Sequence, residues 1–306
     1  MHKSMTQKQR IYAIKRSRWM YALMLLPLAY YLIFCYGPMQ GILIAFENYK
    51  ISKGVFGSAF VGFKWFEKFI TEPYFWKLVR NTLLINFYGL VWGFPVPIIL
   101  ALMLNEVRNS HFRRTVQTLS YLPHFMSTVV VCGMLVNFLS LDGIINRFIS
   151  LLGMEKIQFL IYPQYFRTLF TASGIWQSCG WNSIIYLAAL TAVDQQQIEA
   201  AEIDGANRFQ RILHVSLPAI APTISIMLIM QLGKMMNIGY EKILLLYTGS
   251  TYETADVIST YVYRRGILGA DYSYSTAVGL FQAVVSLVLL CLSNTLSKKL
   301  SETSLW

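Results

Sequence analysis

The chain has 306 residues, of which 55% are hydrophobic and only 13% are charged. Soluble globular domains usually carry about 25% charged residues, so this composition excludes an ordinary soluble enzyme and indicates an integral membrane protein. The formal net charge of +11 does not indicate a nucleic-acid partner, because no basic patch is interleaved with aromatic residues in a polar context.

A basic segment precedes the first apolar run. Its lysines and arginines are Lys3, Lys8, Arg10, Lys15, Arg16 and Arg18. Cytoplasmic segments of membrane proteins carry such an excess, so we predict a cytoplasmic N-terminal tail at 1–18. The apolar run that follows is longer than the core of a signal peptide and has no clear small-x-small cleavage site, so a retained first helix is expected.

Six apolar runs have the length of a membrane-crossing helix, which needs about 20 mostly apolar residues. Their approximate bounds are 19–45, 78–104, 115–139, 169–192, 219–247 and 274–296. Pro95 and Pro97 are expected to kink the second run, because proline removes a backbone donor. The predicted fold class is an all-α integral membrane protein with about six transmembrane helices in one domain, 19–297.

An even number of spans places both termini on one side of the membrane. A short tail at 298–306 is basic at its start, and so is the loop between the second and third runs, which lies on the same side. The outward segments also carry lysine and arginine, so the charged N-terminal tail decides the orientation. We predict a multi-pass protein with both termini in the cytoplasm.

Polar and charged side chains interrupt the fourth and fifth runs. Such groups are costly in hydrocarbon, so they are expected to face the bundle interior or a water-filled path. Hydrogen bonding between helices explains the same polarity, and local pairing of Glu241 with Lys242 at the outer interface explains that pair of charges. The candidates for a substrate pathway are Gln231, Lys234, Asn237, Tyr240 and Glu241 in the fifth run, and Trp176, Gln177 and Asn182 in the fourth.

A patterned polar segment at 194–218 joins the fourth and fifth runs on the cytoplasmic side. Asp194 is placed to cap a helix, with Gln197 three residues later completing a capping-box pattern, which predicts a short helix over 195–203. Gly205 then allows the positive φ of a tight turn. A surface loop with good caps explains this much of the pattern without any partner.

A second short helix is predicted after the glycine, because three apolar residues there share one helical face. Pro218 is expected to end this helix and begin the fifth span. Small side chains in the segment allow a partner surface to approach closely. The apolar residues are Phe209, Ile212 and Leu213, and the small ones are Ala200, Ala201 and Ala206.

The same segment resembles the EAA loop of ABC importer permeases, at the family's spacing and directly before the penultimate helix. The matching residues are Glu199-Ala200-Ala201, Asp204-Gly205-Ala206 and Leu217-Pro218. Two residues before Leu217, where the family usually has another branched residue, this chain has Val215, which is a mild change. A second set of residues is similar to the LplB-type permeases, which belong with the MalF-like maltose and multiple-sugar permeases. These residues are 34–38, 122–123, 239–244 and 252–264.

The resemblance implies the type I permease fold of ABC importers and the role of a membrane subunit that carries an oligo- or polysaccharide into a bacterial cell through the plasma membrane. The implied partners are a cytoplasmic ABC ATPase dimer, a second homologous permease in a heterodimer, and an extracellular solute-binding protein or lipoprotein. The implied contacts with the ATPase subunit are Glu199, Ala200, Ala201, Asp204, Gly205 and Ala206.

No catalytic residue, metal site or cofactor is expected in this chain. The sequence has no GxxxxGK[ST] phosphate-binding loop, so ATP and magnesium are expected on the partner subunit. Amides, carboxylates and aromatics along the candidate pathway suit a sugar, because they bond hydroxyls and stack on rings. The alternative function is an ion-coupled secondary transporter, which predicts inverted repeats that the sequence does not display.

Overall fold

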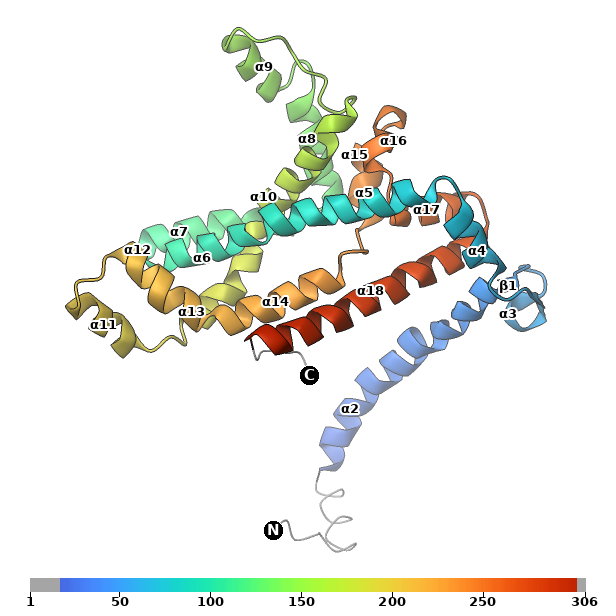
Figure 1. Cartoon of the computed structure of the whole chain (residues 1–306), viewed down its shortest axis with the longest axis horizontal. Coiled ribbons are helices and arrows are strands. Elements are labelled where there is room, and N and C mark those ends of the chain that lie inside the picture. Colours follow the sequence, from blue (N-terminus) through green and yellow to red (C-terminus); the bar gives the residue numbers. More distant parts are fainter. Residues whose placement is uncertain (1–16, 302–306) are drawn as a thin grey trace, which may run out of the picture.

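The computed structural model describes residues 17–301, which are almost entirely helical (Figure 1). Most of the predicted N-terminal tail at 1–18, and residues 302–306 of the predicted C-terminal tail, lie outside this described part. The strands in the described range are β1 (Glu47–Asn48) and β2 (Ala59–Phe60), which pair antiparallel with Glu47 opposite Phe60. The predicted all-α class is confirmed.

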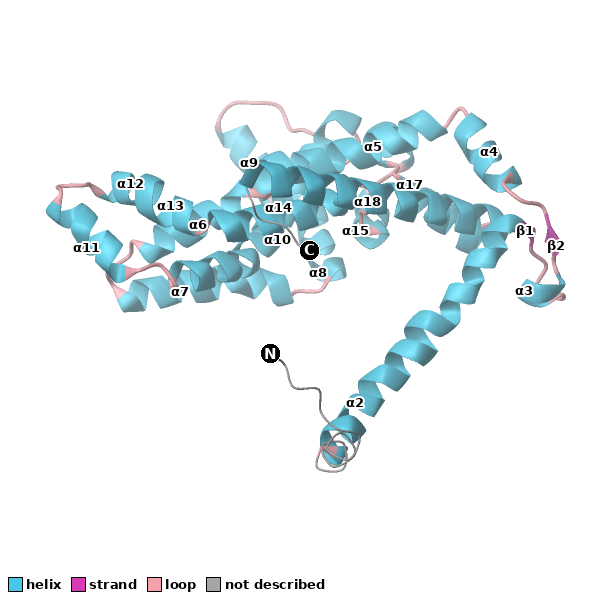
Figure 2. Cartoon of the chain, turned by 60° about the horizontal axis from the view of Figure 1, so that its bottom comes forward, coloured by secondary structure: helices cyan, strands magenta, loops and turns pink. Residues whose placement is uncertain are grey.

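The first predicted span is a helix whose N-terminal part stands away from the other helices in both views (Figures 1 and 2). It runs over Arg18–Phe46 as α2 (Arg18–Tyr30), the π-helical turn η1 (Tyr31–Tyr36) and the 3-10 stretch η2 (Gly37–Phe46). Its most apolar stretch has no residue buried within the described chain. A helix that is apolar all round needs an apolar surrounding, which the bilayer or a neighbouring membrane protein supplies.

The segment after the first span is tied to two later helices through Glu72. This carboxylate accepts hydrogen bonds from the hydroxyls of Tyr261 and Tyr274, and it lies 3.4 Å from the Arg265 guanidinium. Burial raises the pKa of Glu72, but these hydrogen bonds and the positive charge outweigh burial and hold the pKa below its ordinary value. The short helices of the segment are α3 (Gly54–Gly57) and α4 (Lys64–Thr71).

The second predicted span is confirmed as one helical stretch over Phe75–Asn105. It consists of α5 (Phe75–Tyr88), the π-helical turn η3 (Gly89–Gly93) and α6 (Pro95–Asn105). The distortion predicted from the prolines lies just ahead of them. Pro95 is the first residue of α6. Proline is tolerated at this position, because the N–H that it lacks would have no hydrogen-bond partner within α6.

The third predicted span, 115–139, is wrong as one continuous helix. The chain is extended at Met126 and Ser127, and the Ser127 hydroxyl caps the next helix by accepting from the Val130 amide at 3.3 Å. Pro123, in the short 3-10 turn before this break, removes a further helical donor. The elements are α7 (Ser110–Tyr121), η4 (Leu122–Phe125), α8 (Thr128–Leu139) and α9 (Ile144–Leu151).

The fourth predicted span is the helix α10 (Pro163–Leu190), which packs against α6 and α7. Its 28 residues rise about 42 Å, which exceeds the bilayer's hydrocarbon thickness of about 30 Å. The packing with α6 is apolar and includes Ala101, Tyr186 and Leu190, together with Ile220 from the connection that follows α10. This contact places α10 at the centre of the bundle.

The segment 194–218 forms the two short helices that were predicted, and they project at one end of the molecule (Figure 1). Pro218 does not end the second of them, because proline is tolerated in the first turn of α13. The chain bends by 64° only after Ala219. The elements are α11 (Gln195–Ile203), α12 (Arg208–Arg211), the π-helical turn η5 (Ile212–Ser216), α13 (Leu217–Ala219) and α14 (Ala221–Gly233).

The fifth predicted span, 219–247, is also interrupted, because the helix α14 ends at Gly233 and the next helix begins only at Tyr240. Side-chain amides bond the carbonyls in this break. Asn86 donates to the Met235 carbonyl at 2.8 Å and Gln282 donates to the Met236 carbonyl at 2.5 Å. The remaining elements are α15 (Tyr240–Leu246), η6 (Gly249–Thr251), α16 (Tyr252–Ala255), α17 (Ile258–Tyr263), η7 (Arg264–Leu268) and α18 (Tyr272–Ser301).

The predicted count of six spans is not confirmed as such. By length and composition, four helices in the described range qualify as membrane spans, or five if the pair bent after Ala219 forms one span. The third run still contributes one of the four, Thr128–Leu151. The helix α10 is long enough but too polar to qualify, and α14 ends before the fifth run does. The membrane character predicted from composition holds.

Candidate functional site

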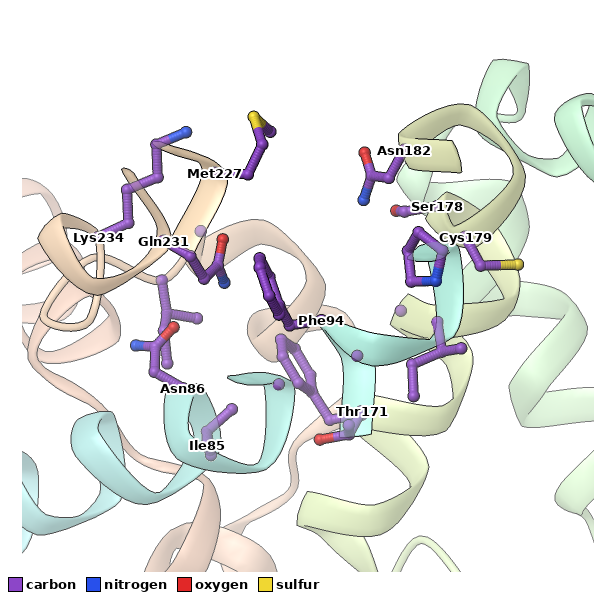
Figure 3. Close-up of a pocket in the computed structure, with 18 of the residues that line it drawn as sticks. Ile85, Asn86, Phe94, Thr171, Ser178, Cys179, Asn182, Met227, Gln231 and Lys234 are labelled. Carbon is purple, nitrogen blue, oxygen red and sulfur yellow. The ribbon is translucent and has the colours of Figure 1, made fainter. Parts of the chain in front are cut away.

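A cavity of about 450 Å³ lies inside the bundle, between the second helical stretch, α10 and α14. Figure 3 shows Asn182 and Ser178 of α10 on one wall, and Gln231 and Lys234 at the end of α14 on another. Phe94 lies between these walls. Amide, hydroxyl and aromatic groups are the chemistry that binds a polar, hydroxyl-rich molecule.

The charge of this cavity is positive. Lys234 is the charged residue among those that line it, and no aspartate or glutamate is present in the lining. A second ammonium lies just behind the wall, because a Cβ added to the lining residue Gly174 would sit 3.7 Å from Lys242 Nζ. Lys242 Nζ donates to the Phe170 carbonyl at 3.3 Å and forms no ion pair with a described residue.

A third cation lies towards the start of α10. Arg167 is one helical turn before the lining residue Thr171, and its Nη2 donates to Asn81 Oδ1 at 3.0 Å. The Nε atom of Arg167 is buried without a hydrogen-bond partner. Arg167, Lys242 and Lys234 all lack an ion pair to a carboxylate in the described range.

The structure brings together three of the pathway residues that were predicted from the sequence. Asn182, Gln231 and Lys234 all line the cavity. On α10, Trp176 is 45% exposed and outside the lining, and Gln177 donates to the Met126 carbonyl at 3.3 Å, at the break before α8. These two side chains leave the helix on sides that do not meet the cavity.

The remaining pathway candidates lie beyond the break that follows α14. Asn237 and Glu241 are exposed and do not line the cavity. Tyr240 stacks on Tyr263, with ring centroids 5.0 Å apart and an interplanar angle of 17°. The sequence had placed these residues on one continuous helix with Lys234, and the break removes that shared face.

Sequence reasoning missed Asn86 and Lys242 as residues of this site. Asn86 lines the cavity and donates a hydrogen bond to the Met235 carbonyl. Its position as an asparagine within an apolar run is the signal from which it could have been identified. Lys242 had been paired with Glu241 as one alternative, but its ammonium turns to the Phe170 carbonyl instead. The fold of α15 onto α10 decides this contact, and no sequence pattern reveals it.

The two short helices at 195–203 and 208–211, with their flanking turns, are here called the coupling loop. Asp194 caps α11 by accepting from the Gln196 amide at 2.9 Å, so the cap is confirmed while Gln197 takes no part in a capping box. Gly205 has φ of +79°, as its role in a tight turn requires. Asn207 and Gln210 form the actual capping box, at the start of α12.

The coupling loop encloses a groove of about 300 Å³ between its two helices. Ala201, Asp204, Gly205 and Ala206 line this groove, whereas Glu199 and Ala200 are exposed on α11. Two large apolar side chains of the loop are open to solvent: Ile203 is 86% exposed and Phe209 is 71% exposed. Such exposure at a protruding tip is typical of a surface that another protein covers.

Comparison with known proteins relates nearly the whole chain to transport components. Residues 93–302 match a family described as "Binding-protein-dependent transport system inner membrane component". Protein LplB of Bacillus subtilis (strain 168) is 44% identical over 295 residues, which covers 96% of this chain and 93% of the relative. The polygalacturonan/rhamnogalacturonan transport system permease protein YteP of the same organism is 44% identical, with coverage of 98% and 94%.

Solved structures give the same result. A chain in the crystal structure of a bacterial alginate ABC transporter, in complex with an alginate pentasaccharide-bound periplasmic protein, superposes with a TM-score of 0.88. It is 42% identical, and the match covers 96% of this chain and 98% of that one. A crystal structure of a bacterial ABC transporter involved in the import of the acidic polysaccharide alginate matches with a TM-score of 0.87.

Proposed function

Because the chain belongs to the family of binding-protein-dependent transport system inner membrane components, we propose that it is the membrane subunit of an ATP-driven importer of acidic saccharides. The predicted resemblance and the type I permease fold are confirmed, and the chain is a sugar-transporting ABC permease with several membrane helices. The proposed part is the import direction, the ATP-driven mechanism, the substrate charge and the cytoplasmic location of both termini.

One observation carries this proposal: the coupling loop continues directly into a wall of the cavity. From α12 the chain passes through η5 and α13 into α14, whose Met227 and Gln231 line the cavity. A movement of the loop therefore acts on the wall through a short, mostly helical connection. ATP shifts such a system only if it binds one arrangement of the ATPase partner better than the other.

The acidic character of the substrate is supported by the charges at the cavity. Lys234 lines it, Lys242 lies behind Gly174, and no carboxylate is present in the lining. An anionic sugar would satisfy these ammonium groups, because charge-assisted hydrogen bonds are stronger than neutral ones. Two similar proteins agree with this substrate class: a polygalacturonan/rhamnogalacturonan transport system permease protein, and a bacterial ABC transporter involved in the import of the acidic polysaccharide alginate.

The partners proposed for the chain are a cytoplasmic ATPase dimer at the coupling loop, a second homologous permease and an extracellular solute-binding protein. An affinity-tagged copy of the chain, expressed in the organism that encodes it, is expected to co-purify with a soluble ATPase and a second permease. In proteoliposomes, this complex should take up oligogalacturonate or oligoalginate when supplied with ATP and its solute-binding protein. Uptake that needs no ATP and collapses with an ionophore would indicate a secondary transporter and overturn the proposal.

The turn at Gly205 provides a test of the coupling loop alone. Replacing Gly205 with valine should reduce uptake by roughly tenfold or more, because β-branched residues are strongly disfavoured at its φ of +79° and the two helices would be reoriented. No heavy atom lies within 4 Å of an added Cβ, so the effect comes from the backbone and not from a clash. Insertion and yield should stay at the level of a Gly279→Val control, and unchanged uptake would count against the loop's role.

A further inference from the structure

A buried arginine joins the coupling loop to the end of a helix that lines the cavity. The side chain of Arg211, on α12, is only 11% exposed. Its Nη2 lies 3.0 Å from Glu106 Oε2, and its Nη1 pairs with Glu202 Oε1. Glu106 follows the last residue of α6 and Glu202 belongs to α11, so one guanidinium connects three helices.

The two bonds of this arginine differ in their surroundings. The Glu106 side chain is 18% exposed, whereas the Glu202 side chain is 47% exposed and its pairing is weakened by solvent. Within the described part of the chain, the Nε atom of Arg211 is buried without a hydrogen-bond partner, and Glu106 and Glu202 are the carboxylates that compensate the charge of the guanidinium. Removing one partner of a buried pair leaves an uncompensated charge, which makes the Glu106 contact the stronger constraint.

The helix α6 connects the ion pair between Arg211 and Glu106 to the cavity. Pro97 on α6 and Phe94 just before it line the cavity, and Glu106 stands at the other end of the helix. The helix of 11 residues spans about 16 Å. The covalent route from the loop to α14 passes a bend of 64° after Ala219, whereas the route through Arg211 and Glu106 reaches the part of the cavity lined by Phe94 and Pro97 through one straight helix.

We propose that Arg211 is a positioning residue that transmits movements of the coupling loop to α6 through its ion pair with Glu106. With this pair in place, the loop holds two walls of the cavity at once: α14 through the chain itself and α6 through the guanidinium. A nucleotide-driven movement of the loop then changes the distance between these walls. The inference rests on the proposed function, since it assumes that an ATPase drives the loop.

The test compares variants within the complete transporter complex in proteoliposomes, measuring uptake of the acidic oligosaccharide and ATP hydrolysis together. Arg211→Gln and Glu106→Gln should each lower the saccharide taken up per ATP by roughly tenfold. The double variant should be no worse than either single variant, because both lose the same contact. Arg108→Gln removes an exposed charge two residues after Glu106, outside the coupling loop, and should leave the ratio unchanged.

Arg211→Lys is a conservative variant that should recover part of the ratio, since it keeps the charge near Glu106. Three results would overturn the inference while the wild-type complex is active: an unchanged ratio in Glu106→Gln, additive losses in the double variant, or loss of the ATPase from complexes purified with either glutamine variant. The last result would assign the pair to docking. A wild-type complex without ATP-dependent uptake would instead refute the proposed function itself.

Discussion

Uptake of an acidic oligosaccharide is expected to fall by roughly a hundredfold when Lys234 and Lys242 are both replaced with methionine. A hydrogen bond to a charged group contributes about 1.5–3 kcal/mol, so each lysine should account for about tenfold or more. Neither lysine has a carboxylate partner in the described range that the substitution would strand. Lys242 is half-buried, and its replacement by methionine removes the cost of desolvating the ammonium group. The double variant is therefore expected to fold.

The measurement is ATP-dependent uptake by the reconstituted complex, with galacturonate oligomers compared against neutral galactose oligomers of equal length. Lys53→Met is the matched control, because Lys53 is exposed in the segment between β1 and α3 and its loss should change neither uptake. If the double methionine variant reduced the uptake of acidic and neutral oligomers equally, the lysines would have a structural role in the bundle and would not recognise the charge of the substrate. Unchanged acidic uptake would remove the argument for an anionic cargo.

A single methyl group at Gly180 is expected to destabilise the whole bundle. An added Cβ would lie 2.2 Å from the Ser120 carbonyl oxygen and 2.4 Å from its carbon. These are backbone atoms of α7, so relief requires α7 and α10 to move apart. Overpacking of this kind typically costs about 1–3 kcal/mol, and we expect Gly180→Ala to lower the unfolding temperature in detergent by roughly 2–5 °C.

Gly279→Ala is the same chemical change at a position of α18 where an added Cβ meets nothing within 4 Å. It should leave the unfolding temperature equal or slightly higher, because alanine is preferred to glycine in a helix by about 0.5–1 kcal/mol. The two variants are therefore expected to shift tryptophan-monitored unfolding in opposite directions. A Gly180→Ala protein as stable as the Gly279→Ala protein would show that α7 and α10 are not in close contact.

The features that sequence predicted best depend on local chemistry. The helix at 195–203, the Asp194 cap and the glycine turn all follow from side chains acting on their own backbone, and each is present. The first, second and last spans were likewise found, because a long apolar run needs only a helix to satisfy its peptide groups in lipid. The coupling motif also led to the family that the comparisons establish.

The features that sequence did not predict are set by contacts between distant segments. The third and fifth runs are each apolar enough to predict one helix, yet each is interrupted. Hydropathy contains no sign of the capping Ser127 or of the amides that bond the carbonyls after α14. The pathway residues beyond Lys234 were misplaced for this reason. The Arg211 pair joins residues 105 positions apart, a separation at which no helical spacing is informative.

The unwound stretch after α14 has a consequence for the lipid around it. The 13 residues of α14 rise about 20 Å, which is less than the thickness of about 30 Å of a bilayer's hydrocarbon layer. Bare peptide groups at that depth would each cost several kcal/mol. The amides of Asn86 and Gln282 occupy the Met235 and Met236 carbonyls from two different helices. These two carbonyls are therefore satisfied by side chains of the protein, as peptide groups within a hydrocarbon layer must be.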